Sequence, residues 1–435
     1  FGKPLLESAK NSPDFGKRLR DMNQRIVRSI LAVGLDTDPP VTGPIDFDVH
    51  AKVSRLAASK GIVLLRNQGV LPLEASKLRS MVIIGGYADS GVLSGGGSSQ
   101  VHAQGGPSVY RPYGDDDRRN PFLGQQYHRS SPLAAIRALA PDAQVAYRRG
   151  WYLTDAVTLA GRSDVAIVFA TQHMSEGFDL PDLSLPEGQD QLIAAVAAAN
   201  PRTIVVLETG GPVLMPWLDK VSAVIEAWYP GIRGGEAIAD ILFGKVNPSG
   251  RLPITFPASE AQLPRPVLPG STDIEPTFTG APRPGEALQI DYDIEGADVG
   301  YRWYARQGLV PLFPFGFGLS YTTFAVDRLG VTLRNQQVVV TAQVRNTGPV
   351  AGEDVVQIDL TSAAGRPTRR LVGYQRVSLA PGESQSVSLN VDPRLLADWS
   401  DGSWLRKGGP YGFSAGRSSM DLGPTVTIAL PRQRS

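Results

Sequence analysis

Titratable side chains gather in one segment of this 435-residue chain, between Thr171 and Pro186. The segment directly follows the apolar run VAIVFA, and its titratable members are His173, Glu176, Asp179 and Asp182. A carboxyl group that such a loop holds over a crevice could be a general acid, with a pKa raised by desolvation. The same acids could equally be solvated loop residues, so spacing alone leaves both interpretations open.

Metal and acyl-transfer chemistry find little support in this segment. His173 and Glu176 form an H-x-x-E pair, but a metal site needs a third ligand, and the chain has only four His and no Cys. Ser175 lies two residues from His173 without a G-x-S-x-G elbow, which argues against acyl transfer. We therefore expect no metal and no cofactor.

A second candidate segment is the glycine-rich LSGGGSSQV, Leu93–Val101, inside the poorly patterned stretch from Gly85 to Ser131. Its glycines permit close approach of the backbone to another group, or simply a mobile turn. The segment lacks Gly-Lys-Ser/Thr, and the chain has no G-x-G-x-x-G at a strand-to-helix turn, so nucleotide binding is disfavoured. Ser98 and Ser99, together with His173, are candidate substrate-binding residues.

The elements that position these segments belong to an α/β domain over residues 46–257, where helix and strand signals alternate. Runs such as VAIVFA and TIVVL are apolar on both faces, as strands of a helix-covered parallel sheet must be. We predict a doubly wound, mostly parallel sheet. Ligands bind beyond the carboxyl ends of such strands, which here means the loops after Ile84, Ala170, Glu208 and Ala227.

Three further parts complete the predicted organisation. Residues 1–45 contain a helix with an apolar stripe from Leu19 to Val33, which has no evident partner surface, followed by a linker. Residues 258–321 are rich in Pro and Gly and predict an extended strap. Residues 322–435 carry short alternating strands with turn signals at about ten-residue intervals, which predicts a fibronectin type III-like antiparallel β-sandwich.

Charge and hydropathy exclude some classes of partner. Lys and Arg number 43 against 42 for Asp and Glu, so the net charge of +1 gives no support to a nucleic-acid partner or an anionic membrane surface. No apolar run approaches the roughly 20 residues of a membrane span. The chain begins at Phe1 without Met or a signal-like segment, so we expect a processed or truncated piece of something longer.

Several long motifs resemble family 3 glycoside hydrolases, the β-glucosidase group. They occur in the family's order over nearly the whole chain and include the GGGSSQ loop and the segments at 61–73, 175–189, 228–257 and 313–324. The resemblance implies a retaining glycosidase with two carboxylates. In the family, an Asp nucleophile lies on an N-terminal (β/α)8 barrel, and a Glu acid/base comes from a loop of the following α/β domain.

The match places the acid/base on Glu176, and Asp179 and Asp182 match the segment that holds its loop. No barrel is present, although the helix at Leu19–Val33 resembles the last helix of the family's barrel. Retaining chemistry needs two carboxyl groups about 5–5.5 Å apart. We therefore expect a partner, the N-terminal barrel as a separate polypeptide or as a segment of the same enzyme.

The resemblance implies hydrolysis of terminal non-reducing β-D-glucosyl residues, with a β-xylosidase-like activity as the alternative within the family. Some members place a Trp in the loop that here is Gly-Gly-Gly-Ser-Ser, so stacking on the aglycone sugar is not expected from it. Two other classes stay open: a non-catalytic carbohydrate-binding module, and a structural domain that stabilises a barrel. The family's habit favours a periplasmic or secreted protein, and a homo-oligomer is left open.

Overall fold

The computed structural model describes residues 2–41, 43–101, 103–112, 124–177, 180–267 and 291–434. It divides into two units, residues 1–48 and 49–435, which we describe separately. The first unit contains helices α1 (Lys3–Asn11) and α2 (Pro13–Ala32). Helices α1 and α2 contact each other, but no described residue of either helix is buried, so the apolar stripe of α2 is only partly covered within its own unit.

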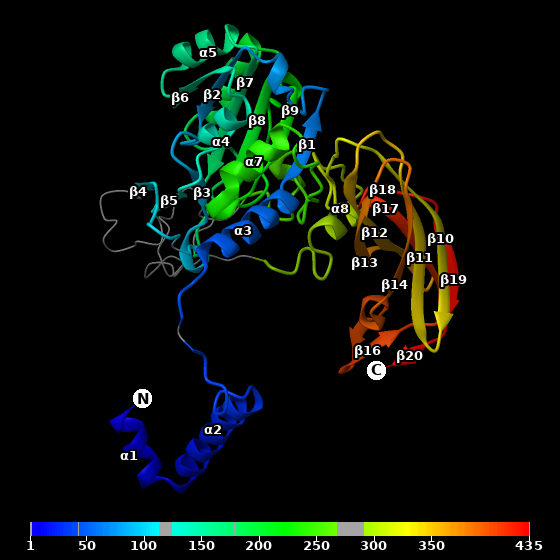
Figure 1. The fold of residues 1–435 in the computed structure, drawn as a ribbon. Coiled ribbons are helices and arrows are strands. Elements are labelled where there is room, and N and C mark those ends of the chain that lie inside the picture. The colour runs from blue at the N-terminus through cyan, green and yellow to red at the C-terminus, as the bar shows by residue number, and fades with distance from the viewer. Residues whose placement is uncertain are drawn as a thin grey trace. The chain divides into compact units, whose positions relative to one another are not determined.

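Helix α3 (Phe47–Gly61) leads into the second unit, which is built on a six-stranded sheet (Figure 1). The strands in spatial order are β1 (Val63–Asn67), β9 (Ala223–Glu226), β8 (Thr203–Thr209), β7 (Val165–Gln172), β2 (Ser80–Gly85) and β6 (Gln144–Arg148). β1 pairs with β9 antiparallel, and every other pairing is parallel. The mostly parallel sheet predicted from the apolar runs is confirmed.

Helices cover both faces of this sheet, as a doubly wound fold requires. Helices α4 (Pro132–Leu139) and α7 (Gly234–Leu242) pack on one face, in front of the strands in Figure 1. Helices α5 (Leu153–Gly161) and α6 (Gln189–Ala199) pack on the other. Neighbouring residues of one strand enter opposite cores: Ile167 packs with α4 and α7, and Val168 with α5 and α6. Burial on both faces explains why the strand sequences are continuous apolar runs.

The poorly patterned stretch from Gly85 to Ser131 contains elements that the sequence did not indicate. Strands β3 (Val92–Ser94), β5 (Gln125–His128) and β4 (Val109–Arg111) form a small antiparallel sheet in that order. Strands of three or four residues are too short to show a period-two pattern, which is why this sheet was missed.

Of the extended strap predicted over residues 258–321, residues 268–290 lie outside the described residues, and the described remainder includes the helix α8 (Tyr301–Gln307). Beyond α8, the chain runs back across the α/β domain through bridges between Phe256 and Phe313 and between Leu64 and Leu319. A seven-residue helix flanked by glycines leaves too few periodic positions to be separated from loop sequence.

The C-terminal part is an antiparallel β-sandwich, as predicted. One sheet contains β10 (Phe324–Arg334), β11 (Gln337–Asn346) and β14 (Ser384–Asn390). The second contains β13 (Arg366–Leu379), β12 (Gly352–Ala363), β17 (Gly409–Ser418) and β18 (Asp421–Leu422), with β19 (Val426–Leu430) on β17. Strands β15 (Asp398–Ser400), β16 (Ser403–Arg406) and β20 (Gln433–Arg434) form a small third sheet.

Polar contacts join the sandwich to the α/β domain. Arg251 and Asp354 form an ion pair whose side chains are only 10% and 0% exposed. Glu353 pairs with both Lys60 and Arg376, each at 2.9 Å. Over the described part of the chain, no helix is long and apolar enough to cross a membrane.

Candidate active site

Glu176 lies in the loop that follows β7, at the carboxyl edge of the sheet, and its side chain is exposed. Its Oε2 accepts a hydrogen bond from the backbone N–H of Ser98 at 2.7 Å. Two separate candidates, the acidic loop and the glycine-rich segment, are therefore brought into direct contact. The ligand-binding edge expected from the sheet topology is where the structure places them.

The glycines of the second segment allow this contact. A Cβ on Gly97 would lie 2.3 Å from the Cβ of Glu176, and Gly97 has φ +73°, so no larger side chain fits. The neighbouring Gly96 N–H donates to the carbonyl of Met174 at 2.9 Å. The lack of a side chain at Gly97 therefore allows the close approach of this backbone to Glu176.

Tyr229 holds the loop from its other side. Its phenol oxygen accepts from the Met174 N–H at 2.8 Å and donates to the Gln172 carbonyl at 2.6 Å. Two glycines are packed against its ring, because a Cβ on Gly95 or Gly210 would lie 2.9 or 3.0 Å from a ring carbon. The Tyr229 hydroxyl therefore joins the end of β7 to Met174, which Gly96 contacts from the other side.

Two carboxyl groups are buried completely beneath this edge. Glu208 is the next-to-last residue of β8, and its Oε2 accepts from the Leu93 N–H at 2.7 Å. Glu226 ends β9, and its Oε1 accepts from the Trp228 N–H at 2.8 Å. Burial raises the pKa of Glu208 to about 8 and that of Glu226 well above its ordinary value.

These buried acids support the segments that contact the loop. Glu208 fixes β3, which leads into the glycine-rich segment, and Glu226 fixes the turn that presents Tyr229. The sequence analysis did not select either acid. The available signal was a lone charged residue at the end of an otherwise apolar strand, in TIVVLE and AVIE.

The downstream side of the loop is also anchored. The Gln189 side-chain amide binds both the N–H and the carbonyl of Thr171, each at 2.8 Å. Asp182 accepts from the Ser184 N–H at 2.8 Å and so closes a local turn. Asp179, which was predicted to help hold the loop, lies outside the described residues.

The electrostatics of Glu176 differ from the expectation for a general acid. Hydrogen bonding to Ser98, from its side chain and then its backbone N–H, lowers the pKa of Glu176 below its ordinary value. Of the two interpretations that the spacing left open, the chain alone shows the solvated one, because the carboxyl of Glu176 is exposed. His173 is half-buried three residues before it, Ser98 is exposed, and the exposed Ser99 donates its hydroxyl to the Gly96 carbonyl at 2.9 Å.

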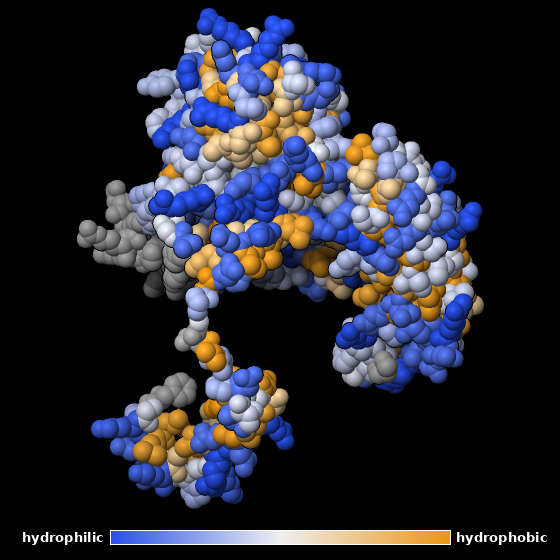
Figure 2. Space-filling view, in the orientation of Figure 1, coloured by the Kyte–Doolittle hydropathy of each residue, from blue (hydrophilic) through white to orange (hydrophobic). Residues whose placement is uncertain are grey.

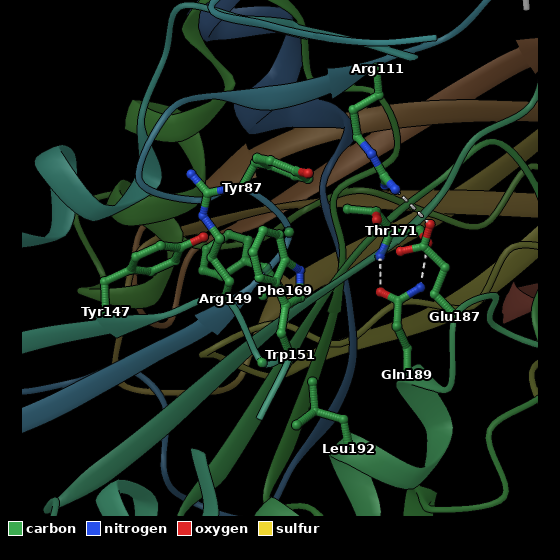
Figure 3. Close-up of a pocket in the computed structure, with 13 residues that line it drawn as sticks. Tyr87, Arg111, Tyr147, Arg149, Trp151, Phe169, Thr171, Glu187, Gln189 and Leu192 are labelled. Atoms are coloured by element: carbon green, nitrogen blue, oxygen red, sulfur yellow. Dashed lines mark hydrogen bonds and ion pairs between the residues drawn. The ribbon is translucent and has the colours of Figure 1, made fainter. Parts of the chain in front are cut away.

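A pocket of about 330 Å³ opens at the ends of β2, β6 and β7 (Figure 3). None of the four predicted site residues lines it. It contains Arg149 beside Tyr87 and Trp151, and an ion pair of 2.9 Å between Arg111 and Glu187. Over the described residues, no group of three His, Cys, Asp or Glu side chains could hold a metal ion.

Comparisons with known proteins identify the family of both domains. Residues 62–321 match the glycosyl hydrolase family 3 C-terminal domain, and residues 355–419 match a fibronectin type III-like domain. The chain is 34% identical to Thermostable beta-glucosidase B of Acetivibrio thermocellus, over 97% of this chain and 53% of that protein. It is 32% identical to an exo-alpha-(1->6)-L-arabinopyranosidase of Bifidobacterium breve, over 88% of this chain and 49% of that protein.

Among solved structures, the fold is similar to DesR, a beta-glucosidase from Streptomyces venezuelae in complex with D-glucose. The TM-score is 0.76 at 30% sequence identity, covering 93% of this chain and 63% of DesR. The chain thus spans about half the length of the curated relatives named above. With an α/β domain that matches along its length and a sandwich that matches the accompanying domain, the chain belongs to glycosyl hydrolase family 3.

Proposed function

We propose that this chain is part of a retaining β-glucosidase-like enzyme that hydrolyses terminal non-reducing β-D-glucosyl residues, with Glu176 as the general acid/base. The observation that carries the proposal is the position of Glu176, on an anchored loop at the carboxyl edge of the sheet. Family membership and the names of the relatives support the reaction class.

In this mechanism, Glu176 first donates a proton to the leaving-group oxygen, and it later removes a proton from the attacking water. The second carboxylate must come from elsewhere. The family resemblance assigns it to a (β/α)8 barrel, whereas the described residues form a six-stranded sheet and a β-sandwich. The partner we propose is therefore the N-terminal barrel of the same enzyme.

In the chain alone, the lowered pKa of Glu176 suits the second step of this cycle, in which the residue acts as a base. The hydrogen bonds from Ser98 favour the carboxylate, which is the form that removes a proton from water. Donation to the leaving group needs a raised pKa, which desolvation provides in other glycosidases. We propose that the barrel and the bound sugar cover Glu176 and supply that desolvation.

Exposed apolar helix faces support the proposal of a barrel partner. On α3, Val49, Val53 and Leu56 recur at helical spacing and are 50%, 61% and 57% exposed. Figure 2 shows this apolar patch on the surface of the second unit. In the first unit, α2 exposes Ile26 and Ile30. Apolar stripes of this kind are normally covered in a folded protein.

The test replaces Glu176 in the enzyme that includes the barrel. Glu176→Gln should lower turnover of cellobiose by about 10²–10⁴-fold, the usual contribution of a general acid. An aryl glucoside with a good leaving group needs less protonation, so its loss should be much smaller, and azide should partly restore activity to Glu176→Ala. Glu74→Gln, at an exposed carboxylate, is the matched control. Near-normal turnover of cellobiose by Glu176→Gln would overturn the assignment.

A further inference from the structure

The pocket of Figure 3 lies at the topological switch point of the sheet and borders the base of the proposed catalytic loop through Thr171 and Gln189, but none of the four predicted site residues lines it. Helix α4, on one face, connects β2 to β6, and α5, on the other face, connects β6 to β7. The chain therefore passes from β2 to β6 on one side of β2, and then crosses to β7 on the other side of β2. Crevices at such points, beyond the carboxyl ends of the strands, are where open α/β sheets bind ligands.

Arg149 supplies a positive charge to this pocket. Its guanidinium carbon lies 5.2 Å from the ring centre of Tyr87 and 5.1 Å from that of Trp151. Within the described part of the chain, Arg149 forms no ion pair and donates no hydrogen bond. A guanidinium placed against aromatic rings keeps its N–H edges as donors, and these match the oxygens of a carboxylate or a phosphate.

A second donor lies next to that charge. The Oη atom of Tyr147 is buried and has no hydrogen-bond partner among the residues described. Burial, and secondly the carboxylate of Asp89, raise the pKa of Tyr147, so the phenol keeps its proton. Figure 3 shows this hydroxyl and the Arg149 guanidinium on the same side of the pocket, both toward Tyr87. The carboxylate of Asp89 is within reach of this hydroxyl, which can donate either to that carboxylate or to a ligand bound in the pocket.

The other charges of the pocket already neutralise each other. Arg111 and Glu187 pair at 2.9 Å on the opposite side in Figure 3. The three charged lining residues leave a net charge of +1, centred on Arg149, and the carboxylate of Asp89 acts on Tyr147 from outside the lining. Phe169 and Leu192 add apolar lining, which suits the body of a small organic molecule.

Two residues of the pocket hold unusual backbone conformations. Tyr87 and Glu187 have φ of +51° and +59°, although neither is glycine. Strain of this kind persists where the surroundings impose it, and it concentrates at ligand sites. Here it brings the Tyr87 ring to Arg149 and the Glu187 carboxylate to Arg111.

From these observations we propose that the pocket is a second ligand site, distinct from the acid/base loop, which binds a small oxyanion-bearing molecule no larger than a monosaccharide. The carboxylate or phosphate group is bound by Arg149 and Tyr147, and its body lies against Phe169 and Leu192. Binding there needs no glycosidase chemistry, so the proposal is independent of the role of Glu176.

The experiment measures equilibrium binding to the 435-residue chain by titration calorimetry. The probes are D-glucuronate, inorganic phosphate and D-glucose, the neutral counterpart of glucuronate. At least one of the two oxyanions should bind. Glucose should bind at least about tenfold more weakly than that oxyanion, because it cannot form the charge-assisted hydrogen bond. Binding of glucuronate alone identifies a carboxylate as the preferred group, and binding of phosphate alone identifies a phosphoryl group.

Variants separate the pocket from general attraction of anions to the surface. Arg149→Gln should weaken oxyanion binding about tenfold or more, and Tyr147→Phe should weaken it less. Arg162→Gln removes another exposed arginine outside the pocket and should leave binding unchanged, as should Glu176→Gln. The proposal fails if the wild-type chain binds neither oxyanion, if glucose binds equally well, or if Arg149→Gln and Arg162→Gln behave alike.

Discussion

The buried carboxyl of Glu208 makes the stability of the α/β domain depend on pH in an unusual direction. Its side chain is 0% exposed, and burial raises its pKa to about 8. The folded state therefore keeps the proton that the unfolded chain releases near pH 4.5. The contribution of Glu208 to stability is complete below the unfolded pKa and is lost as the pH rises through 8.

The size of this effect follows from the displacement of the pKa. Each pKa unit corresponds to about 1.4 kcal/mol, so a rise from 4.5 to about 8 corresponds to about 5 kcal/mol. Between pH 5 and pH 8, about 4 kcal/mol of this should disappear. Glu208→Gln cannot titrate, and its carbonyl oxygen can still accept from the Leu93 N–H. Between pH 5 and pH 8, the free energy of unfolding of the variant should therefore rise by about 4 kcal/mol relative to that of the wild type.

Urea unfolding followed by tryptophan fluorescence and circular dichroism, at several pH values from 5 to 8, measures this difference. The free energy of unfolding of the wild type should fall more steeply with rising pH than that of Glu208→Gln, by about 1.4 kcal/mol per pH unit. The pKa of Glu226 is also raised above its ordinary value, so the free energy of unfolding of the variant should still depend on pH to some extent. Glu74→Gln, at an exposed carboxylate, should follow the wild type. Parallel lines for Glu208→Gln and the wild type would refute the argument.

Two substitutions test the anchoring of the loop. Gly97→Ala combines φ +73° with a Cβ only 2.3 Å from the Cβ of Glu176, and it should lower turnover of the barrel-containing enzyme at least tenfold. The control is Gly382→Ala, which has φ +76° but open space around its Cβ. Thermal unfolding should show that this control costs only about 1–2 kcal/mol of stability. Equal activity of the two variants would contradict the steric argument. Tyr229→Phe should speed hydrogen exchange of the Met174 amide about tenfold or more, because the amide loses a hydrogen bond worth about 1–3 kcal/mol. The control is Tyr304→Phe, which removes a buried hydroxyl that has no partner among the described residues. It should leave exchange of the Met174 amide unchanged. An unchanged amide in Tyr229→Phe would show that the phenol does not hold the loop.

The sheet could be predicted from the sequence because burial on both faces leaves a direct trace in the residues. VAIVFA has no polar position and TIVVL only its first residue, Thr203, and in the structure both runs are covered by helices on each side. The same argument placed the acidic loop at the carboxyl edge. What the pattern did not specify is the direction of β1, which is antiparallel at the edge of the sheet. An apolar edge strand has the same pattern in either direction.

The residues that position Glu176 were harder to predict, because their partners are distant in sequence. Glu208 accepts from Leu93, which lies 115 positions away, and a glutamate at a strand end ordinarily indicates solvent. Arg149 and Tyr87 come from the ends of different strands and meet only when β6 and β2 pair. No local pattern encodes such contacts. The family resemblance selected Glu176 as a candidate but none of the groups beneath it.

Position and protonation of Glu176 have different origins. The chain fixes the position through Gly97, Ser98 and Tyr229, all within its own α/β domain. The same contacts lower the pKa, because Ser98 donates to a carboxylate that faces solvent. A proton donor at neutral pH needs the opposite shift, which a neighbouring carboxylate and removal of water from the carboxyl can provide. In the mechanism we propose, the chain therefore places the acid/base, and the surface that closes over it makes it an acid.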